Sequence, residues 1–263
     1  MKKISLLGLS LILLTACNNT STAKIKNSVQ TETIQEVSTV LPTKKTSLIA
    51  IPEESTQLLV VETANWSTKE GVLQRYEKKN KHWEKVGESI SIVLGRNGLG
   101  WGLGLHKTPK NAPYVKKEGD GKAPAGLFSL NTAFGYSPAN FSMHFPYATY
   151  KTTDHCVDDS NSIWYNKIVD STTTQKDYKS FEHMKLKNNL YKYGIVVNHN
   201  PQQKSQAGSC IFMHIKSQSG RGTAGCTAMN ENKIVEVLKW LKGEEKPLLL
   251  QLPKEEMVKV ILN

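Results

Sequence analysis

The chain has 263 residues, 38% of them hydrophobic, and its 34 Lys and Arg against 23 Asp and Glu give a formal net charge of +11. This length and composition suit one domain with a proper buried core, and they exclude a wholly disordered chain. The positive charge favours anionic polymers as partners, although a lysine-rich solvated surface would give the same value. No basic run is interleaved with aromatic residues, so the sequence does not indicate nucleic-acid binding.

The N-terminus has the features of a secretion signal. Residues 1–3 are Met-Lys-Lys, and the apolar run at 4–14 is too short to span a bilayer comfortably. Residues 14–17, Leu-Thr-Ala-Cys, resemble the lipobox of bacterial lipoproteins, which implies cleavage before Cys17 and a lipid on its thiol. The alternative is an ordinary secretion signal with an incidental cysteine. We therefore predict a signal peptide at 1–16 and a mature protein held at a membrane surface.

Residues 17–55 are predicted to form the lipid anchor and a flexible tether. Ser, Thr, Lys, Gln, Asn and Glu dominate there, with no aromatic residue and no sustained hydrophobic period. A tether of about 40 residues reaches on the order of 30–40 Å from its anchor. Asn18 beside Cys17 resembles the sorting pattern of outer-membrane lipoproteins. This resemblance implies a periplasm-facing protein on the outer membrane if the cell is Gram-negative.

The remaining residues, 56–263, are predicted to form a single domain that is mainly β with a few helices (α+β). Short apolar or alternating runs between polar turns indicate strands at 57–66, 71–77, 82–86, 90–94, 126–130, 190–198, 209–214 and 248–252. Asn80 and Lys81 are predicted to form the turn that leads into the strand at 82–86. One helix is predicted over 231–242, with Asn230 as its N-cap and Gly243 at its end. The apolar residues at helical spacing that predict it are Ile234, Val235, Leu238 and Leu241.

The segment 208–228 holds a histidine and a cysteine in a setting that suits nucleophilic chemistry. His214 ends an apolar run, and Cys226 follows a polar loop and the small residues at 223–225. A histidine at the end of a strand can act as a general base, and a cysteine on a glycine turn leaves backbone N–H groups for an oxyanion. Each residue also has an ordinary structural interpretation, since free cysteines and strand-end histidines are often simply packed. The residues alone leave both interpretations open.

This segment resembles the active-site signature of the YkuD-type L,D-transpeptidases, in which a histidine precedes a Ser/Thr-x-Gly-Cys element. His214 matches the upstream histidine, and Thr223, Gly225 and Cys226 match the element. Ala224 stands where many members have a second histidine, and the interval between histidine and cysteine is shorter than in the common form.

Other segments resemble the same family. They are the glycine-rich stretches 94–102 and 118–128 and the segment 156–166, so that the likeness covers most of residues 57–250. The resemblance implies a YkuD-like mixed β-sandwich that forms one catalytic domain.

The resemblance also implies a reaction. Cys226, with His214 as its base, would attack a peptidoglycan tetrapeptide stem after its third residue. Backbone N–H groups around Gly225 and Cys226, in the element that begins at Thr223, would hold the oxyanion. The D-alanine would leave and a thioester would remain. An amine acceptor then gives a 3→3 cross-link, protein attachment or D-amino acid exchange, whereas water makes the enzyme an L,D-carboxypeptidase. The sequence does not choose between these acceptors.

Two further residues are predicted to bind substrate. Arg221 lies beside the nucleophile in sequence and is expected to contact a carboxylate of the stem. Asp158 is expected to bind a cationic group or to orient His214, with the capping of a turn as an alternative. We predict no cofactor and no metal.

The remaining cysteines leave alternatives open. Cys156 and Cys210 can form a disulfide in an oxidising compartment, whereas Cys226 has to stay reduced. A reversible bridge between Cys210 and Cys226 is one alternative. A zinc site from Cys210, His214 and Cys226, with a fourth ligand from Cys156 or His199, is another.

Two other classes of protein compete with the transpeptidase interpretation. An NlpC/P60-type endopeptidase places its cysteine before its histidine, and no histidine follows Cys226 in this chain. A non-catalytic wall-binding lipoprotein is the other rival, which the intact pair of His214 and Cys226 disfavours. The partners predicted are peptidoglycan stem peptides and, through the lipid on Cys17, a membrane; the protein is predicted to be a monomer.

Overall fold

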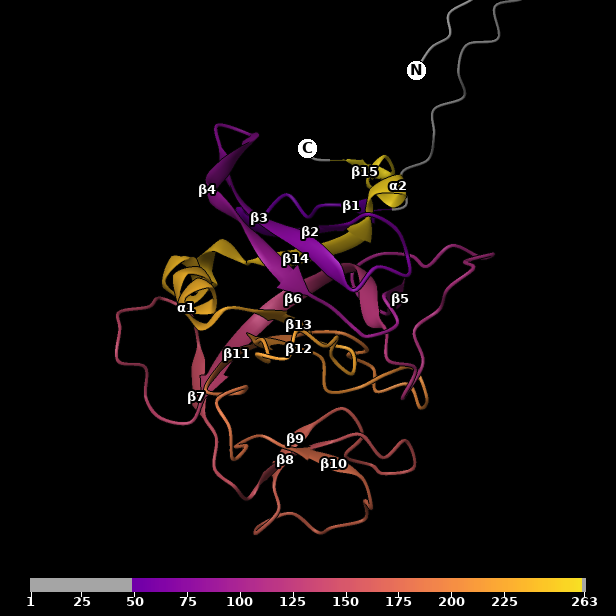
Figure 1. Ribbon diagram of the computed structural model, residues 1–263, viewed down its shortest axis with the longest axis vertical. Coiled ribbons are helices and arrows are strands. Elements are labelled where there is room, and N and C mark those ends of the chain that lie inside the picture. Colours follow the sequence, from indigo (N-terminus) through magenta and orange to yellow (C-terminus); the bar gives the residue numbers. More distant parts are fainter. Residues whose placement is uncertain (1–48, 262–263) are drawn as a thin grey trace, which may run out of the picture. The chain divides into compact units, whose positions relative to one another are not determined.

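The structure, a computed structural model, describes residues 49–261 (Figure 1). The predicted signal peptide at 1–16, the lipidation site Cys17 and the tether up to residue 48 lie outside the described residues. From residue 49 to 261 the chain is mainly β with a few helices, as the sequence predicts. No helix in this range is long and apolar enough to cross a membrane.

The strands follow one another along most of the chain. They are β1 (Ile49–Ala50), β2 (Gln57–Thr63), β3 (Glu70–Lys79), β4 (His82–Val93), β5 (Leu99–Trp101), β6 (Ala123–Gly135), β7 (Tyr147–Thr149), β8 (Asp154–Val157), β9 (Ile168–Asp170), β10 (Phe181–His183), β11 (Tyr193–Val197), β12 (Phe212–Ile215), β13 (Thr227–Met229), β14 (Leu248–Pro253) and β15 (Val260–Ile261). The helices are α1 (Glu231–Trp240), the 3₁₀ turn η1 (Gly243–Glu245) and α2 (Lys254–Met257).

Ten strands form one large sheet in the order β11-β12-β13-β4-β3-β2-β14-β6-β5, with β7 paired to β6. This sheet closes on itself, because β11 pairs with β6 as well as with β12. Strands β2 and β14 lie side by side in parallel, and their largely apolar, buried sequences fit strands with neighbours on both sides. Fully buried side chains from these strands make up the main core, among them Leu58, Leu73, Leu127, Ile195, Met213 and Leu249.

A smaller sheet of three strands, in the order β10-β8-β9, lies apart from the large one, near β12 and β13 (Figure 1). Its own core consists of Val157, Val169 and Tyr178. The disulfide from Cys156 in β8 to Cys210, just before β12, ties the small sheet to the large one. The small sheet therefore brings its side chains next to the start of β12.

The turn predicted at Asn80 and Lys81 is confirmed. Both residues have positive φ angles, 49° and 67°, as a two-residue type I′ hairpin turn requires. The predicted break between strands 82–86 and 90–94 is wrong, because β4 runs unbroken from His82 to Val93. The polar stretch around Gly87 (φ 62°) is instead an irregularity inside the strand, where the register with β3 shifts.

Two other predicted boundaries differ from the structure. The strand predicted over 209–214 begins only at Phe212, because Cys210 has a φ of 54° and cannot continue an extended strand. At the N-terminal side, β1 pairs in parallel with β15, and Ile49 and Ile51 are buried. Residues 49–51, which the sequence assigns to the tether, thus pack on the folded part of the chain.

The predicted helix forms as α1, but it ends two residues early, at Trp240 rather than Lys242. Leu241 is already extended, with a ψ of 137°, although its side chain is buried. Asn230 occupies the N-cap position with no side-chain hydrogen bond to the helix. Its backbone carbonyl accepts the first helical bonds, so Asn230 marks the start of the helix without capping it through its amide group.

The buried face of α1 consists of Ile234, Val237 and Leu238, whereas the predicted Val235 is only partly buried. We expect Leu238→Ala to lower the free energy of unfolding by about 2–5 kcal/mol, because it opens a cavity at a fully buried position. Val235→Ala should cost about 1 kcal/mol or less. Urea unfolding of the two variants checks this, and equal losses would contradict the assigned face.

Candidate functional site

His214 lies in β12, and Cys226 directly precedes β13, the parallel strand beside it. The register pairs Met213 with Thr227 and His214 with Ala228. Continued back by one residue, it sets Cys226 beside Phe212, whose backbone N–H donates to Cys226 Sγ at 3.4 Å. Because side chains alternate along a strand, His214 and Cys226 project from the same face, two residues or about 7 Å apart along the strands. In the described range no hydrogen bond joins them directly.

Cys226 is a free, buried thiol, 5% exposed. Its Sγ lies 3.7 Å from the carbonyl oxygen of Cys210, toward which the thiol donates. Burial, and then the charge of Glu182, raise the pKa of the thiol far above its ordinary value. The N–H of Phe212 and the ammonium of Lys116 act in the opposite direction. In the resting site the sulfur is therefore a protonated thiol.

The imidazole of His214 is oriented by a backbone carbonyl. Its Nδ1 lies 2.8 Å from the oxygen of Ile215, so Nδ1 carries the proton and Nε2 is left as the basic nitrogen. Burial lowers the pKa of His214 to about 4, although the bond to Ile215 acts against this shift. The ring is therefore neutral near pH 7 and able to accept a proton. A backbone carbonyl leaves no signal in the sequence, which is why the orienting group could not be predicted.

Thr223 and Gly225 shape the turn that presents Cys226. The Thr223 hydroxyl donates to the carbonyl of Cys226 at 2.6 Å and accepts the N–H of Gly225 at 3.2 Å. The Gly225 N–H is thus engaged inside the turn and is not free for an oxyanion, contrary to the prediction. The N–H of Cys226, the other predicted donor, forms no hydrogen bond with residues 49–261, so it stays available for an oxyanion.

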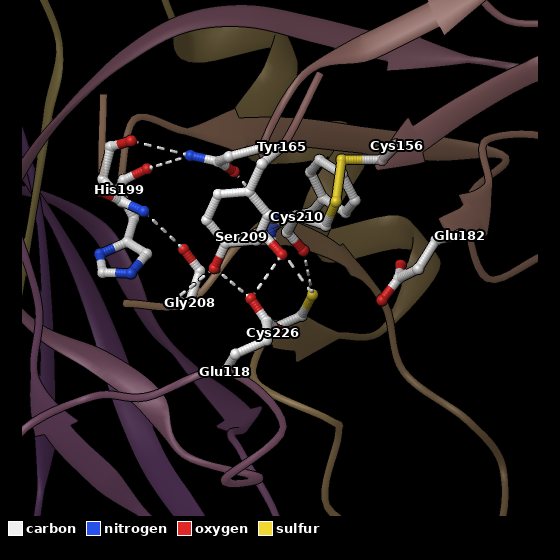
Figure 2. Close-up of a disulfide and its surroundings, with 12 residues drawn as sticks. Glu118, Cys156, Tyr165, Glu182, His199, Gly208, Ser209, Cys210 and Cys226 are labelled. Atoms are coloured by element: carbon white, nitrogen blue, oxygen red, sulfur yellow. Dashed lines mark hydrogen bonds between the residues drawn. A yellow bond between two sulfur atoms is a disulfide. The ribbon is translucent and has the colours of Figure 1, made fainter. Parts of the chain in front are cut away.

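Cys226 opens into a small hollow of about 130 Å³. Figure 2 shows Glu118 and Glu182 approaching the Cys226 sulfur from different sides. The charged residues that line the hollow are Arg96, Lys116, Glu118, Asp158 and Glu182. It is a polar, crowded hollow that admits a group of only a few heavy atoms.

Glu118 and Lys116 are each held by hydrogen bonds. Glu118 accepts the hydroxyl of Ser209 at 2.8 Å and that of Tyr165 (Figure 2). Lys116, which is almost fully buried, donates to Asp120 at 2.6 Å. Both side chains are therefore fixed in place before any substrate arrives.

The structure separates the two predicted substrate-binding residues. Asp158 lines the Cys226 hollow, where its Oδ1 is buried and finds no hydrogen-bond partner in the described range. It does not orient His214 through Nδ1, because Ile215 occupies that nitrogen. Arg221 is exposed and lines a second hollow of about 390 Å³ together with His214. Ala224 lines both hollows, so they meet at the nucleophile turn.

The disulfide between Cys156 and Cys210, left open by the sequence, is present, with Cα atoms 5.9 Å apart. Because Cys210 is bonded to Cys156, the predicted alternative of a disulfide between Cys210 and Cys226 is absent from this structure. The disulfide also removes both sulfurs from the zinc set that the sequence allows, and residues 49–261 contain no cluster of His, Cys, Asp or Glu suited to a metal ion.

Sequence reasoning missed Tyr191 and Glu182. The Tyr191 ring lies edge-on to that of His214, with centroids 5.2 Å apart, and its hydroxyl donates to Glu182 at 2.6 Å. Tyr191 also packs in the same apolar cluster as Cys226. These residues are far from the Thr223–Cys226 element in the chain, and no motif marks them, so only the packing of the two sheets reveals them.

Comparison with known proteins gives little further guidance. The chain matches no protein-family model and no curated protein sequence. Among solved structures it is similar to the helical cell shape determining protein Pgp2 from Campylobacter jejuni and to its K307A mutant, with 15% sequence identity and a TM-score of 0.42 in both cases. The match covers 83% of this chain and 57% or 56% of those chains. A likeness at this level carries no argument about the fold or the activity, which have to come from the residues themselves.

We expect the His214 imidazole to stay neutral as the pH falls from 8 to 5 and to gain its proton near pH 4. Because an unfolded histidine binds its proton near pH 6.5, the unfolded state takes up the proton first, and His214 makes folding less favourable as the pH falls from about 6.5 to about 4. Nitrogen chemical shifts, with His214→Gln to assign the resonance, measure this titration. A midpoint near 6.5 would contradict the burial of the ring.

Proposed function

We propose that the protein is a cysteine acyltransferase of the L,D-transpeptidase type that acts on peptidoglycan tetrapeptide stems. The observation that carries this proposal is the parallel pairing of β12 and β13, which sets a reduced thiol and a neutral imidazole on one face of a sheet. The resemblance of the Thr223–Cys226 element to the YkuD signature supplies the substrate class. We further propose that the closed sheet is a variant of the YkuD-like mixed β-sandwich.

The reaction begins when the proton of Cys226 passes to Nε2 of His214, directly or through a water molecule. The thiolate attacks the carbonyl carbon after the third residue of the stem, so that an S–C bond forms and the carbonyl oxygen becomes an oxyanion. The N–H of Cys226 stabilises that oxyanion, and one such donor is worth about 3 kcal/mol of barrier. The C–N bond then breaks, and the leaving D-alanine takes the proton from His214.

The thioester that remains is resolved by an incoming nucleophile. An amine from a second stem loses a proton to His214 and forms a 3→3 cross-link, whereas water gives a free carboxylate and a shortened stem. The larger hollow beside His214 and Arg221 has the position required for this incoming group. Arg221, at the edge of that hollow, is proposed to contact a carboxylate of the stem.

The proposal includes the location of the enzyme. The lipobox-like segment that ends at Cys17 supports a lipid anchor, and the tether predicted over residues 17–55 would supply reach above the membrane. A tethered enzyme would meet a wall polymer that lies above the membrane surface.

Incubation with purified disaccharide-tetrapeptide tests the function. Cross-linked dimer identifies transpeptidation, tripeptide alone identifies carboxypeptidase activity, and unchanged substrate supports a wall-binding protein instead. We expect Cys226→Ala to lose turnover by about 10⁴-fold or more and His214→Gln by about 10²–10⁴-fold. Glu62→Gln, on an exposed position of β2, is the matched control and should keep full activity.

A carbapenem should acylate the same sulfur, because its strained amide is open to attack by an activated thiol. Mass spectrometry of the treated protein is expected to show one adduct, on the peptide that contains Cys226. The adduct should be absent from Cys226→Ala. An unmodified wild-type protein, or an adduct elsewhere, would count against Cys226 as the nucleophile.

A further inference from the structure

Glu182 lines the Cys226 hollow but has no role in the proposed reaction. It comes from β10 of the small sheet, where it pairs in register with Cys156 of β8. Cys156 is joined by the disulfide to Cys210, whose carbonyl accepts the thiol of Cys226. Figure 2 shows the Glu182 carboxylate turned toward the Cys226 sulfur. The small sheet thus delivers a carboxylate to the nucleophile.

No cation balances this carboxylate. Among residues 49–261, no lysine, arginine or histidine forms an ion pair with Glu182 or with Asp158 on the same hollow. Lys116, the buried cation of the hollow, is already paired with Asp120 at 2.6 Å. Asp158 keeps a buried oxygen without a partner. A poorly hydrated negative charge without a partner is costly, so the hollow favours a positively charged group.

Tyr191 connects Glu182 to the reacting pair. Its hydroxyl donates to Glu182 at 2.6 Å, while its ring touches His214 and packs with Cys226. Burial keeps the pKa of this phenol well above its ordinary value, so Tyr191 always has a proton to donate. The hydroxyl serves either the carboxylate or a thiolate. Burial, and the charges of Asp158 and Glu118, raise the pKa of Glu182, whereas the hydrogen bond from Tyr191 stabilises its charged form. In that charged form Glu182 holds the hydroxyl and repels a negative sulfur.

We propose that Glu182 gates the ionisation of Cys226: its carboxylate, holding the hydroxyl of Tyr191, keeps the thiol protonated until a primary ammonium group of the substrate enters the hollow and pairs with Glu182 and Asp158. The assignment of the ammonium to a substrate rests on the proposed function. Once the ammonium is bound, the repulsion on the sulfur falls and the Tyr191 hydroxyl is free for the thiolate. The proton of Cys226 moves to Nε2 of His214.

The geometry restricts the ligand to a small cation. The hollow of about 130 Å³ accepts a terminal –CH₂–NH₃⁺ or –CH–NH₃⁺ group but not a bulky quaternary one. The other charged groups that face Cys226 are Lys116, Glu118 and Arg96, and of these Lys116 and Glu118 are held by their own hydrogen bonds. Glu182 and Asp158 are the carboxylates left to bind the incoming cation.

The rate at which iodoacetamide, a neutral reagent, alkylates Cys226 at pH 7.5 tests the gate without any turnover. We expect Glu182→Gln to react at least tenfold faster than the wild type, since a fall of one unit in the thiol pKa gives about ten times more thiolate. Tyr191→Phe should react at least threefold more slowly, because it removes the hydroxyl that offsets the charge of Glu182 near the sulfur and leaves the carboxylate in place. Glu62→Gln, the exposed glutamate of β2, should match the wild type.

The two variants are expected to change the alkylation rate in opposite directions. Loss of folding cannot produce this result, because it would expose the thiol and speed alkylation in both. A Glu182→Gln rate equal to that of the wild type overturns the proposal, and so does a faster Tyr191→Phe. The proposed function can fail separately, through lack of turnover on the tetrapeptide, while the alkylation rates still separate as expected.

A second series identifies the ligand chemistry. Methylammonium chloride should speed alkylation of the wild type to a plateau, at constant ionic strength, and should leave Glu182→Gln unchanged. Tetramethylammonium, which is larger and has no N–H donor, should have no effect on either protein. Equal effects of the two cations would mean simple screening and would overturn the gate, as would a methylammonium effect that persists in Glu182→Gln.

Discussion

The site depends on the parallel pairing of β12 with β13. A parallel register fixes which residues lie opposite each other. Here it pairs His214 with Ala228 and leaves Cys226 on the same face as His214, one residue before β13 begins. A slip of one residue would turn one of the two side chains to the opposite face of the sheet, into the main core. Met213 and Ile215, which face that core, resist such a slip because both are buried among apolar neighbours.

The small sheet completes the site from outside the large one. Without the disulfide between Cys156 and Cys210, nothing covalent would hold β8 and β10 against the start of β12. The same bridge fixes the carbonyl that accepts the Cys226 thiol, so one covalent bond positions both the acceptor of the thiol and the carboxylate of Glu182. The three-stranded sheet therefore contributes Glu182 to the lining of the Cys226 hollow, while its own core is small and consists of Val157, Val169 and Tyr178.

The sequence predicts those features that arise from local pattern. Alternation and turn residues predict β3, β4 and the hairpin at Asn80, and the apolar run predicts β14. The candidate pair of His214 and Cys226 is predicted by its own segment, because residue type and spacing carry that signal. Local pattern gives the wrong answer where pairing with another strand decides the structure. The polar residues around Gly87 predict a break between two strands, but they form a bulge within β4.

Contacts made by backbone groups, or between residues far apart in the chain, could not be predicted from the sequence. The carbonyl of Ile215, which orients His214, belongs to the backbone and would be the same for any residue. The sequence suggests the N–H of Gly225 as an oxyanion donor, but in the structure it donates to the hydroxyl of Thr223. Glu182 and Tyr191 become part of the site only through the packing of the small sheet on the large one. The sequence therefore predicts the reacting atoms but not the groups that control them.

A thiol that stays protonated at rest also solves a problem that this arrangement creates. Cys226 packs in the same apolar cluster as the disulfide between Cys156 and Cys210. A thiolate in that position is the species that attacks a disulfide, and attack on Cys210 would release Cys156 and consume the nucleophile. Burial and the nearby carboxylate disfavour the thiolate, and so protect the bridge that holds the site together. If Cys226 ionised only when substrate fills the hollow, the thiolate would form beside the substrate carbonyl carbon. It would then attack that carbon instead of the disulfide. Burial is the larger cause of the raised pKa of Cys226 and the charge of Glu182 the second, and a bound cation would neutralise this second contribution. A raised pKa in the resting protein is thus compatible with the proposed reaction.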